Sequence, residues 1–124
     1  MTIGKNLWAI PEGYIPPDSE EQKGSRFVSH EAACLLNAND QDAHVAITLY
    51  FVEREPVGPY KVRIPARRTL HLRFNDLEDP EPVPRDTPYS SVIESDLPIV
   101  VQHTRLDSRK EALGLLSTIA WPAT

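Results

Sequence analysis

The sequence predicts an all-β fold: a jelly-roll-like antiparallel β-sandwich formed by a single domain over residues 1–124, with flexible ends at 1–5 and 122–124. Proline supplies 12 of the 124 residues and glycine 5. Proline at this density interrupts helices but suits short strands joined by rigid turns. Several segments alternate apolar and polar residues with the period of a strand. Turn-forming residues separate these segments about every 8–12 residues, a spacing typical of sandwiches.

The N-terminal third is predicted to hold short strands around one long loop. Residues 6–10 are apolar and are stopped by Pro11, and residues 11–25 have the proline, glycine and charged residues of a loop. Residues 26–29 and 31–37 are predicted to be extended. In the second of these segments, alternate side chains share one face: Ala33, Leu35 and Asn37.

The middle of the chain gives the clearest strand prediction. β-branched and aromatic residues fill residues 43–53 without a breaker, and one face is apolar: Val45, Ile47, Leu49 and Phe51. Residues 60–64 and 67–74 are predicted to be two more short strands. One face of the later strand is apolar, and the other carries Arg67, Thr69, His71 and Arg73. Residues 75–88 are acidic and rich in proline, so a surface loop is expected there.

The C-terminal third begins with two predicted strands, at residues 89–95 and 97–106. Residues 108–121 fit two structures. Ser108 and Glu111 have the spacing of a helical capping box. Against a helix, apolar side chains recur with period two, at Leu113, Leu115, Ile119 and Trp121. We favour a last strand preceded by a short turn.

Charge and cysteine content limit the class of protein. The chain has 13 Lys and Arg residues against 18 Asp and Glu residues, a formal charge of −5, which argues against a surface devoted to nucleic acid. The single cysteine, Cys34, excludes an intramolecular disulfide and a zinc site built from several cysteines. No run of about 18 apolar residues occurs and the N-terminus lacks the layout of a signal peptide, so a cytoplasmic location is expected.

No recognisable catalytic or metal-binding motif is present in the sequence. The four histidines do not have zinc-ligand spacing: His30, His44, His71 and His103. The sequence contains no G-x-S-x-G motif and no glycine-rich phosphate-binding loop. We therefore expect a protein that is not an enzyme and that needs no metal and no cofactor.

A run of basic residues is the first candidate for a binding surface. Six of them lie between residues 61 and 73 with no acid among them: Lys61, Arg63, Arg67, Arg68, His71 and Arg73. On a strand, Arg67, His71 and Arg73 can line one face, which would suit a phosphate, a carboxylate, a sugar or an acidic partner. The alternative, which we favour, is that nearby acids neutralise the run within the fold: Asp76, Glu78, Asp79, Glu81 and Asp86.

Aromatic side chains are the second candidate. They lie in or beside the predicted loops: Trp8, Tyr14, Tyr50, Tyr60, Tyr89 and Trp121. Rings flanked by polar residues hold sugars in lectin-like sandwiches, and Trp8 and Tyr14 are the candidates for that role. Packing or contact between subunits is the interpretation that we favour for most of these rings.

Several collinear blocks resemble the sensory rhodopsin transducer family. They include WAIPEGYIPP at 8–17, LNANDQDAHV at 36–45, VRIPARRT at 62–69 and SDLPIVVQHTRLDSR at 95–109, and the likeness extends over residues 6–121. The resemblance implies a jelly-roll-like sandwich, a homotetramer, and a cytoplasmic partner of a membrane-embedded sensory rhodopsin. Family members also resemble carbohydrate-binding modules, and a role with nucleic acid has been considered for them. The resemblance supplies no catalytic residues.

The expected function is therefore signal transduction by a binding protein. The cytoplasmic face of a membrane receptor is rich in Lys and Arg, so the acidic segment at residues 76–86, with Glu78 and Glu81, is the expected contact. A module that binds a sugar or a small anion, unrelated to light, is the alternative, with sites at Trp8, Tyr14 or the Arg67 face. A DNA-associated regulator is a further alternative that the net charge of −5 disfavours.

Overall fold

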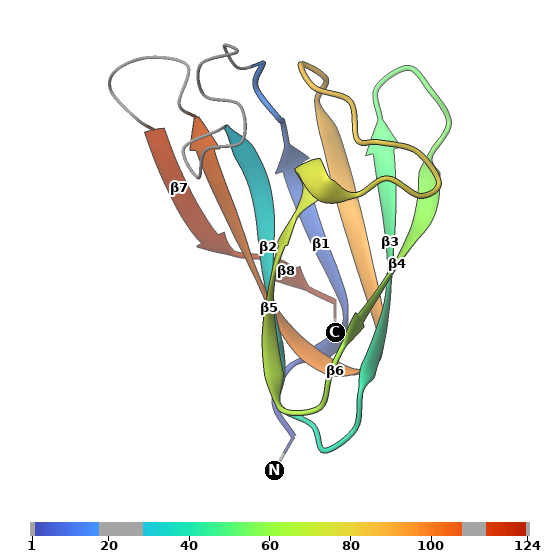
Figure 1. Cartoon of the computed structure of the whole chain (residues 1–124), viewed down its shortest axis with the longest axis vertical. Helices are drawn as coiled ribbons and strands as arrows, with labels where there is room; N and C mark the ends of the chain where they lie inside the picture. The colour runs from blue at the N-terminus through green and yellow to red at the C-terminus, as the bar shows by residue number, and fades with distance from the viewer. Residues whose placement is uncertain (1, 18–28, 108–113, 124) are drawn as a thin grey trace.

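The structure is a computed structural model that describes residues 2–17, 29–107 and 114–123. These residues form eight strands and a short 3-10 helix (Figure 1). The strands are β1 (Lys5–Gly13), β2 (His30–Asn37), β3 (Ala43–Phe51), β4 (Val57–Ile64), β5 (Arg68–Arg73), β6 (Tyr89–Asp107), β7 (Gly114–Ile119) and β8 (Trp121–Pro122), and the helix is η2 (Phe74–Asp76). All of their pairings are antiparallel, which confirms the prediction of an all-β sandwich.

Two sheets share the long strand β6. Its first part pairs with β1 and β3, and these strands form sheet A in the order β4-β3-β6-β1-β8. Its second part pairs with β2 and β7, and together with β5, which pairs with β2, they form sheet B. In Figure 1 the two parts of β6 meet in a bend at the lower end of the molecule. The core lies between the sheets.

The core forms where the alternation of the sequence turns apolar side chains inward. On β3, Val45, Ile47 and Leu49 are all buried, as predicted. On β2, the structure places the face of Ala33, Leu35 and Asn37 inward, and each of these residues is 0% exposed. The apolar side chains among these belong to one continuous cluster that also receives residues from β1, β4 and β6.

The bend in β6 differs from the two separate strands predicted at 89–95 and 97–106. Ser95 is the last residue that pairs with β3, and Val100 is the first that pairs with β2. Pro98 lies between them, where its missing N–H removes no ladder hydrogen bond. The chain therefore continues as one strand from sheet A into sheet B.

The strands at the two ends of the chain are longer than expected. β1 starts at Lys5 and continues past Pro11, which lies at a shift in its register with β6 between Ile10 and Gly13. β8 includes Pro122, so neither Lys5 nor Pro122 lies in a flexible end as predicted. The strand prediction near the C-terminus is confirmed by β7. The predicted extended segment at 26–28 and the capping box of Ser108 and Glu111 lie outside the described residues.

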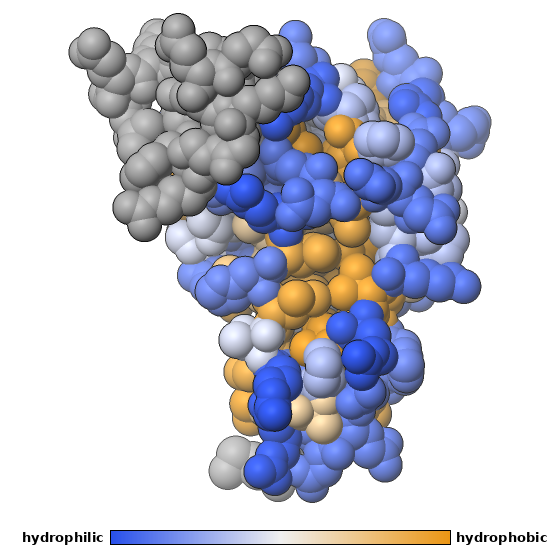
Figure 2. All heavy atoms as spheres, viewed as in Figure 1, coloured by the Kyte–Doolittle hydropathy of each residue, from blue (hydrophilic) through white to orange (hydrophobic). Residues whose placement is uncertain are grey.

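The predicted surface loop at 75–88 also contributes to the core. It begins within η2, whose Phe74 is buried, and the side chains of Leu77 and Val83 are buried in the apolar cluster. In Figure 1 the loop crosses the upper end of the molecule between β5 and β6. Seen from the same side, an apolar band lies below it between β5 and β4, flanked by hydrophilic side chains (Figure 2).

Two buried tyrosines make an informative pair for a stability measurement. The Tyr60 hydroxyl donates a 2.7 Å hydrogen bond to the Glu81 carbonyl, whereas the buried Tyr89 hydroxyl has no partner among the described residues. We expect Tyr60→Phe to lower the free energy of unfolding by about 1 kcal/mol and Tyr89→Phe to leave it unchanged or raise it. Burial raises the pKa of both phenols, so the free energy of unfolding should fall as the pH rises above about 10. The fall should be less steep in either variant, because each variant lacks one of the two phenols.

Urea unfolding of the two variants and the unaltered protein, at pH 7 and pH 10.5, tests this expectation. A loss at Tyr89→Phe equal to that at Tyr60→Phe would show that the Tyr89 hydroxyl is paired.

Candidate functional site

A carboxylate is buried between the two sheets. Glu31, near the start of β2, is 1% exposed. Its Oε1 accepts hydrogen bonds from the backbone N–H of Tyr14 (2.8 Å) and from Nε of Arg105 (2.5 Å). Its Oε2 lies 2.5 Å from Nε2 of His103, which is also buried. We call Glu31, His103 and Arg105 the buried cluster.

Strand register brings the cluster together. β2 and β6 are antiparallel, with Glu31 opposite Arg105 and Ala33 opposite His103. Because side chains two positions apart share a face, Glu31, His103 and Arg105 all point into the sandwich.

Two loops and β1 are tied to the same cluster. Arg105 also donates from its second terminal nitrogen to Oε1 of Glu12 on β1, at 2.8 Å. Burial disfavours the Arg105 cation, but the hydrogen bonds that it donates to Glu12 and Glu31 outweigh this effect and raise the pKa of the guanidinium. The N–H of Glu31 donates to Oδ1 of Asn75, at 3.2 Å, and the Tyr14 hydroxyl bonds Asp86. The cluster therefore connects β1, β2, β6 and the loop at 75–88.

A groove opens at the edge of the sandwich beside this cluster. It has a volume of about 400 Å³ and lies between β1 and the β7–β8 segment. Its walls are mostly apolar, with His103, Glu12 and Thr118 as polar groups, and the apolar lining comes from Ile10, Pro11, Leu116, Ile119, Ala120, Trp121 and Pro122. Small-molecule sites share this size and character, about 300–1,000 Å³ and apolar with few polar groups. We call it the edge groove.

The strand beside the groove exposes large apolar side chains. β7 pairs with β6 and forms an edge of sheet B, and all six of its residues are exposed. Leu115, Ile119 and Trp121 of β7 and β8 are between 61% and 72% exposed. A charge-free apolar edge of this kind is typical of an interaction surface.

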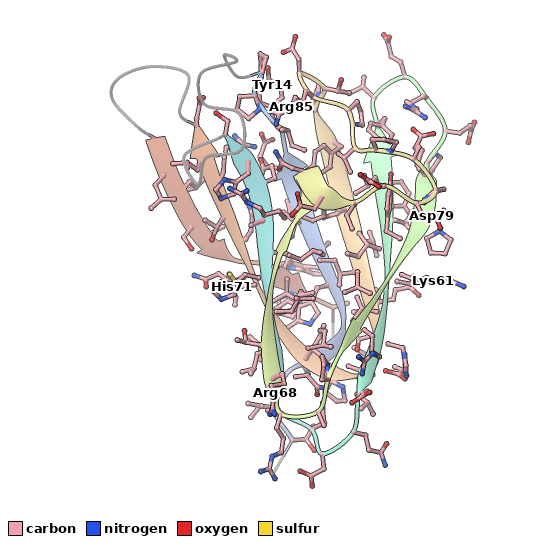
Figure 3. The ribbon with its side chains drawn as sticks, in the orientation of Figure 1. Tyr14, Lys61, Arg68, His71, Asp79 and Arg85 are labelled. Carbon is pink, nitrogen blue, oxygen red and sulfur yellow. The ribbon has the colours of Figure 1, made fainter. Side chains whose placement is uncertain are left out.

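The basic run at 61–73 is divided between the two sheets. Lys61 and Arg63 lie on β4 and, with His44, line a shallow groove of about 430 Å³. His71 and Arg73 lie on β5, and Arg73 bonds Nδ1 of His30 at 2.8 Å. Figure 3 shows His71 and Lys61 extending away from the body of the molecule on opposite sides.

Arg67 does not join His71 and Arg73 in a row, contrary to prediction. It precedes β5 in a turn and has a positive φ of 55°, so its side chain is outside the strand alternation. Its nearest acid is Asp40, at 3.8 Å, and both groups are exposed.

The favoured neutralisation of the basic run by the acidic loop is also wrong for the described residues. Arg63 pairs with Asp42 at 2.7 Å, in the turn between β2 and β3. Glu81 pairs with Arg54 at 2.6 Å, outside the basic run. Glu78 and Asp79 are exposed and have no ion pair with a described residue. Figure 3 shows Asp79 on the outside of the molecule, away from Arg68.

The aromatic candidates are structural parts of the fold. Trp8 is 4% exposed, and its Nε1 donates to the carbonyls of Lys5 and Ile99 at 3.0 Å, so its ring is not a platform for a sugar. Tyr14 is half-buried and supports Glu31 through its backbone and Asp86 through its hydroxyl. Trp121 and Tyr50 are exposed: Trp121 lines the edge groove, and Tyr50 lines a separate shallow hollow.

Sequence reasoning did not single out the buried cluster or the edge groove. A signal was present, because Glu31 and His103 fall on the inward faces of alternating segments, where a polar side chain needs a buried partner. The identity of that partner depends on pairing between β2 and β6, which the local pattern does not contain.

These features define an antiparallel β-sandwich with a buried ionic cluster and a ligand-sized groove at one edge. The chain belongs to the family described as "Anabaena sensory rhodopsin transducer", which it matches over residues 3–122. This confirms the resemblance drawn from the sequence.

Solved structures that are similar to this chain include two that it matches over most of its length. The Anabaena sensory rhodopsin transducer is 60% identical, with 88% of this chain and 94% of that chain covered and a TM-score of 0.79. A Thermotoga maritima protein designated 1070 is 36% identical, with 97% and 96% covered and a TM-score of 0.85. Comparison with curated proteins finds no match. Within the described part of the chain, no helix has the length and apolar character needed to span a membrane.

Proposed function

We propose that this protein is a non-enzymatic signal transducer that works in the cytoplasm as a homotetramer and binds a membrane-embedded sensory rhodopsin. The observation that carries the proposal is its 60% identity, over 94% of that chain, to a protein named as a sensory rhodopsin transducer.

The acidic end of the molecule is the proposed contact with the receptor. The ion pair between Arg54 and Glu81 holds the β3–β4 loop against the loop at 75–88. Exposed acids from both loops gather there: Glu53, Glu55, Asp76, Glu78 and Asp79. A receptor surface rich in Lys and Arg complements this charge and would accelerate its association.

Removing one of these charges tests the contact. We expect Glu78→Gln to weaken binding to the purified receptor about three-fold at low salt, with little difference from the unaltered protein at high salt. Asp40→Asn is the matched control, because Asp40 is exposed at the opposite end, in the turn after β2. Titrations at several salt concentrations give the affinities. Equal effects of the two substitutions would remove the acidic end from the proposal, and light scattering that gives a monomer would remove the homotetramer.

A small-anion-binding module is a second candidate function. The shallow groove lined by His44, Lys61 and Arg63 supports it, since these groups can converge on phosphate. Asp42 already occupies Arg63, however, at 2.7 Å, which reduces the charge available for an anion. The sugar-binding alternative has less support, because Trp8 is buried.

A further inference from the structure

The edge groove takes no part in the proposed contact with the receptor. We infer that it is a binding site for a small amine with an apolar body, such as an aromatic ring joined to a protonated amino group. The proposal rests on the shape of the groove, on the hydrogen-bonding groups along it, and on its charge.

The apolar body is indicated by the groove walls. The apolar lining comes from Ile10 and Pro11 of β1, Leu116 of β7, and Trp121 and Pro122 of β8. Its volume of about 400 Å³ lies at the lower end of the range for ligand sites. The exposed indole of Trp121 can also stack on a ring or receive a cation on its face.

The amino group is indicated by hydrogen-bond acceptors that the fold leaves open. The ring of His103 is 3% exposed and lines the groove, and its Nε2 is engaged with Glu31. Its Nδ1 has no hydrogen bond to any described residue. Glu12 uses Oε1 for Arg105, and its Oε2 is likewise unpartnered within the described chain.

The local charge favours a cation over an anion. The described residues that line the groove include the carboxylate of Glu12 and no Lys or Arg. A carboxylate ligand of the same shape would meet Glu12 as a like charge and would find few donors to bind it.

Phenethylamine and phenylacetate test the inference as a pair of equal shape and opposite charge. We expect phenethylamine to bind the full-length protein saturably, with a dissociation constant of about 1 mM or tighter, and to shift the NMR signals of Trp121 and His103. Phenylacetate should bind at least about ten-fold more weakly. Equal affinities would show that charge does not select the ligand and would overturn the proposal.

Matched leucine substitutions locate the site. Leu116→Ala, in the groove wall, should weaken phenethylamine binding about five-fold or more, since it removes buried apolar contact. Leu36→Ala, on β2 and outside the groove, should leave it unchanged. Glu12→Gln keeps an acceptor for Arg105 and should also weaken binding. Failure to bind, or equal loss in both leucine variants, would overturn the site. Because these titrations omit the receptor, their failure would leave the proposed transducer function standing.

Discussion

Replacing Glu31 with glutamine is expected to lower the free energy of unfolding by about 3–5 kcal/mol. The carboxylate is 1% exposed and accepts hydrogen bonds from Arg105 and the Tyr14 backbone, with His103 at 2.5 Å. Glutamine has one acceptor oxygen and two N–H donors. It would therefore leave the half-buried Arg105 cation without its buried counter-ion. Its NH2 group would also point at His103 or at the Arg105 guanidinium, where the carboxylate now accepts a hydrogen bond.

Urea unfolding at pH 7 measures the effect. Glu78→Gln makes the same chemical change at an exposed position and should alter stability by less than about 0.5 kcal/mol. A double-mutant cycle with Arg105→Gln should show a coupling energy above about 1 kcal/mol, because the two side chains are in contact. A Glu31→Gln variant as stable as Glu78→Gln would mean that the buried cluster does not stabilise the fold.

The strands that alternate most regularly were predictable because their pattern is local. In β3, every second residue is apolar and no proline or glycine interrupts the run, so the inner face could be assigned from the residues alone. In β2 the alternation predicted only that Ala33, Leu35 and Asn37 share a face, because the other face is apolar as well. Burial of one face fixes the register, because a shift by one residue would move the whole apolar set to solvent.

The candidate site was not predictable in this way because it depends on pairing across the chain. Glu31 and His103 are 72 positions apart, and only the pairing of β2 with β6 brings them together. Trp8 was proposed for a sugar site, yet Ile99, 91 positions away, accepts a hydrogen bond from its indole in the interior. Arg67 followed the strand alternation in the sequence, but its positive φ places it in a turn. In each case a contact or backbone angle absent from the local pattern decided the role.

A second large effect is expected at Asn37, which joins three connections at the lower end of the sandwich (Figure 1). Its buried amide nitrogen donates to the carbonyls of Gln41, Ile64 and Pro65 at 2.9, 3.0 and 3.2 Å. Its Oδ1 accepts from the backbone and side chain of Asn39, which in turn donates to the carbonyl of Pro98 at the bend of β6. One side chain thus ties together the β2–β3 turn, the β4–β5 turn and, through Asn39, the β6 bend.

Asn37→Asp is therefore expected to destabilise the protein by about 3 kcal/mol or more at pH 7. The substitution keeps the shape but replaces the donor with a second carboxylate oxygen, which faces three carbonyls in the interior. Asn6→Asp is the matched control, since Asn6 is exposed and donates one hydrogen bond, to the carbonyl of Ser95 at 3.1 Å. That variant should lose about 1 kcal/mol or less. Thermal and urea unfolding of both variants give the comparison. Lowering the pH toward 3 should restore part of the stability lost in Asn37→Asp, because protonation gives the carboxyl group a hydrogen-bond donor. Equal losses in the two variants, or a loss that does not depend on pH, would show that Asn37 does not hold the three connections together.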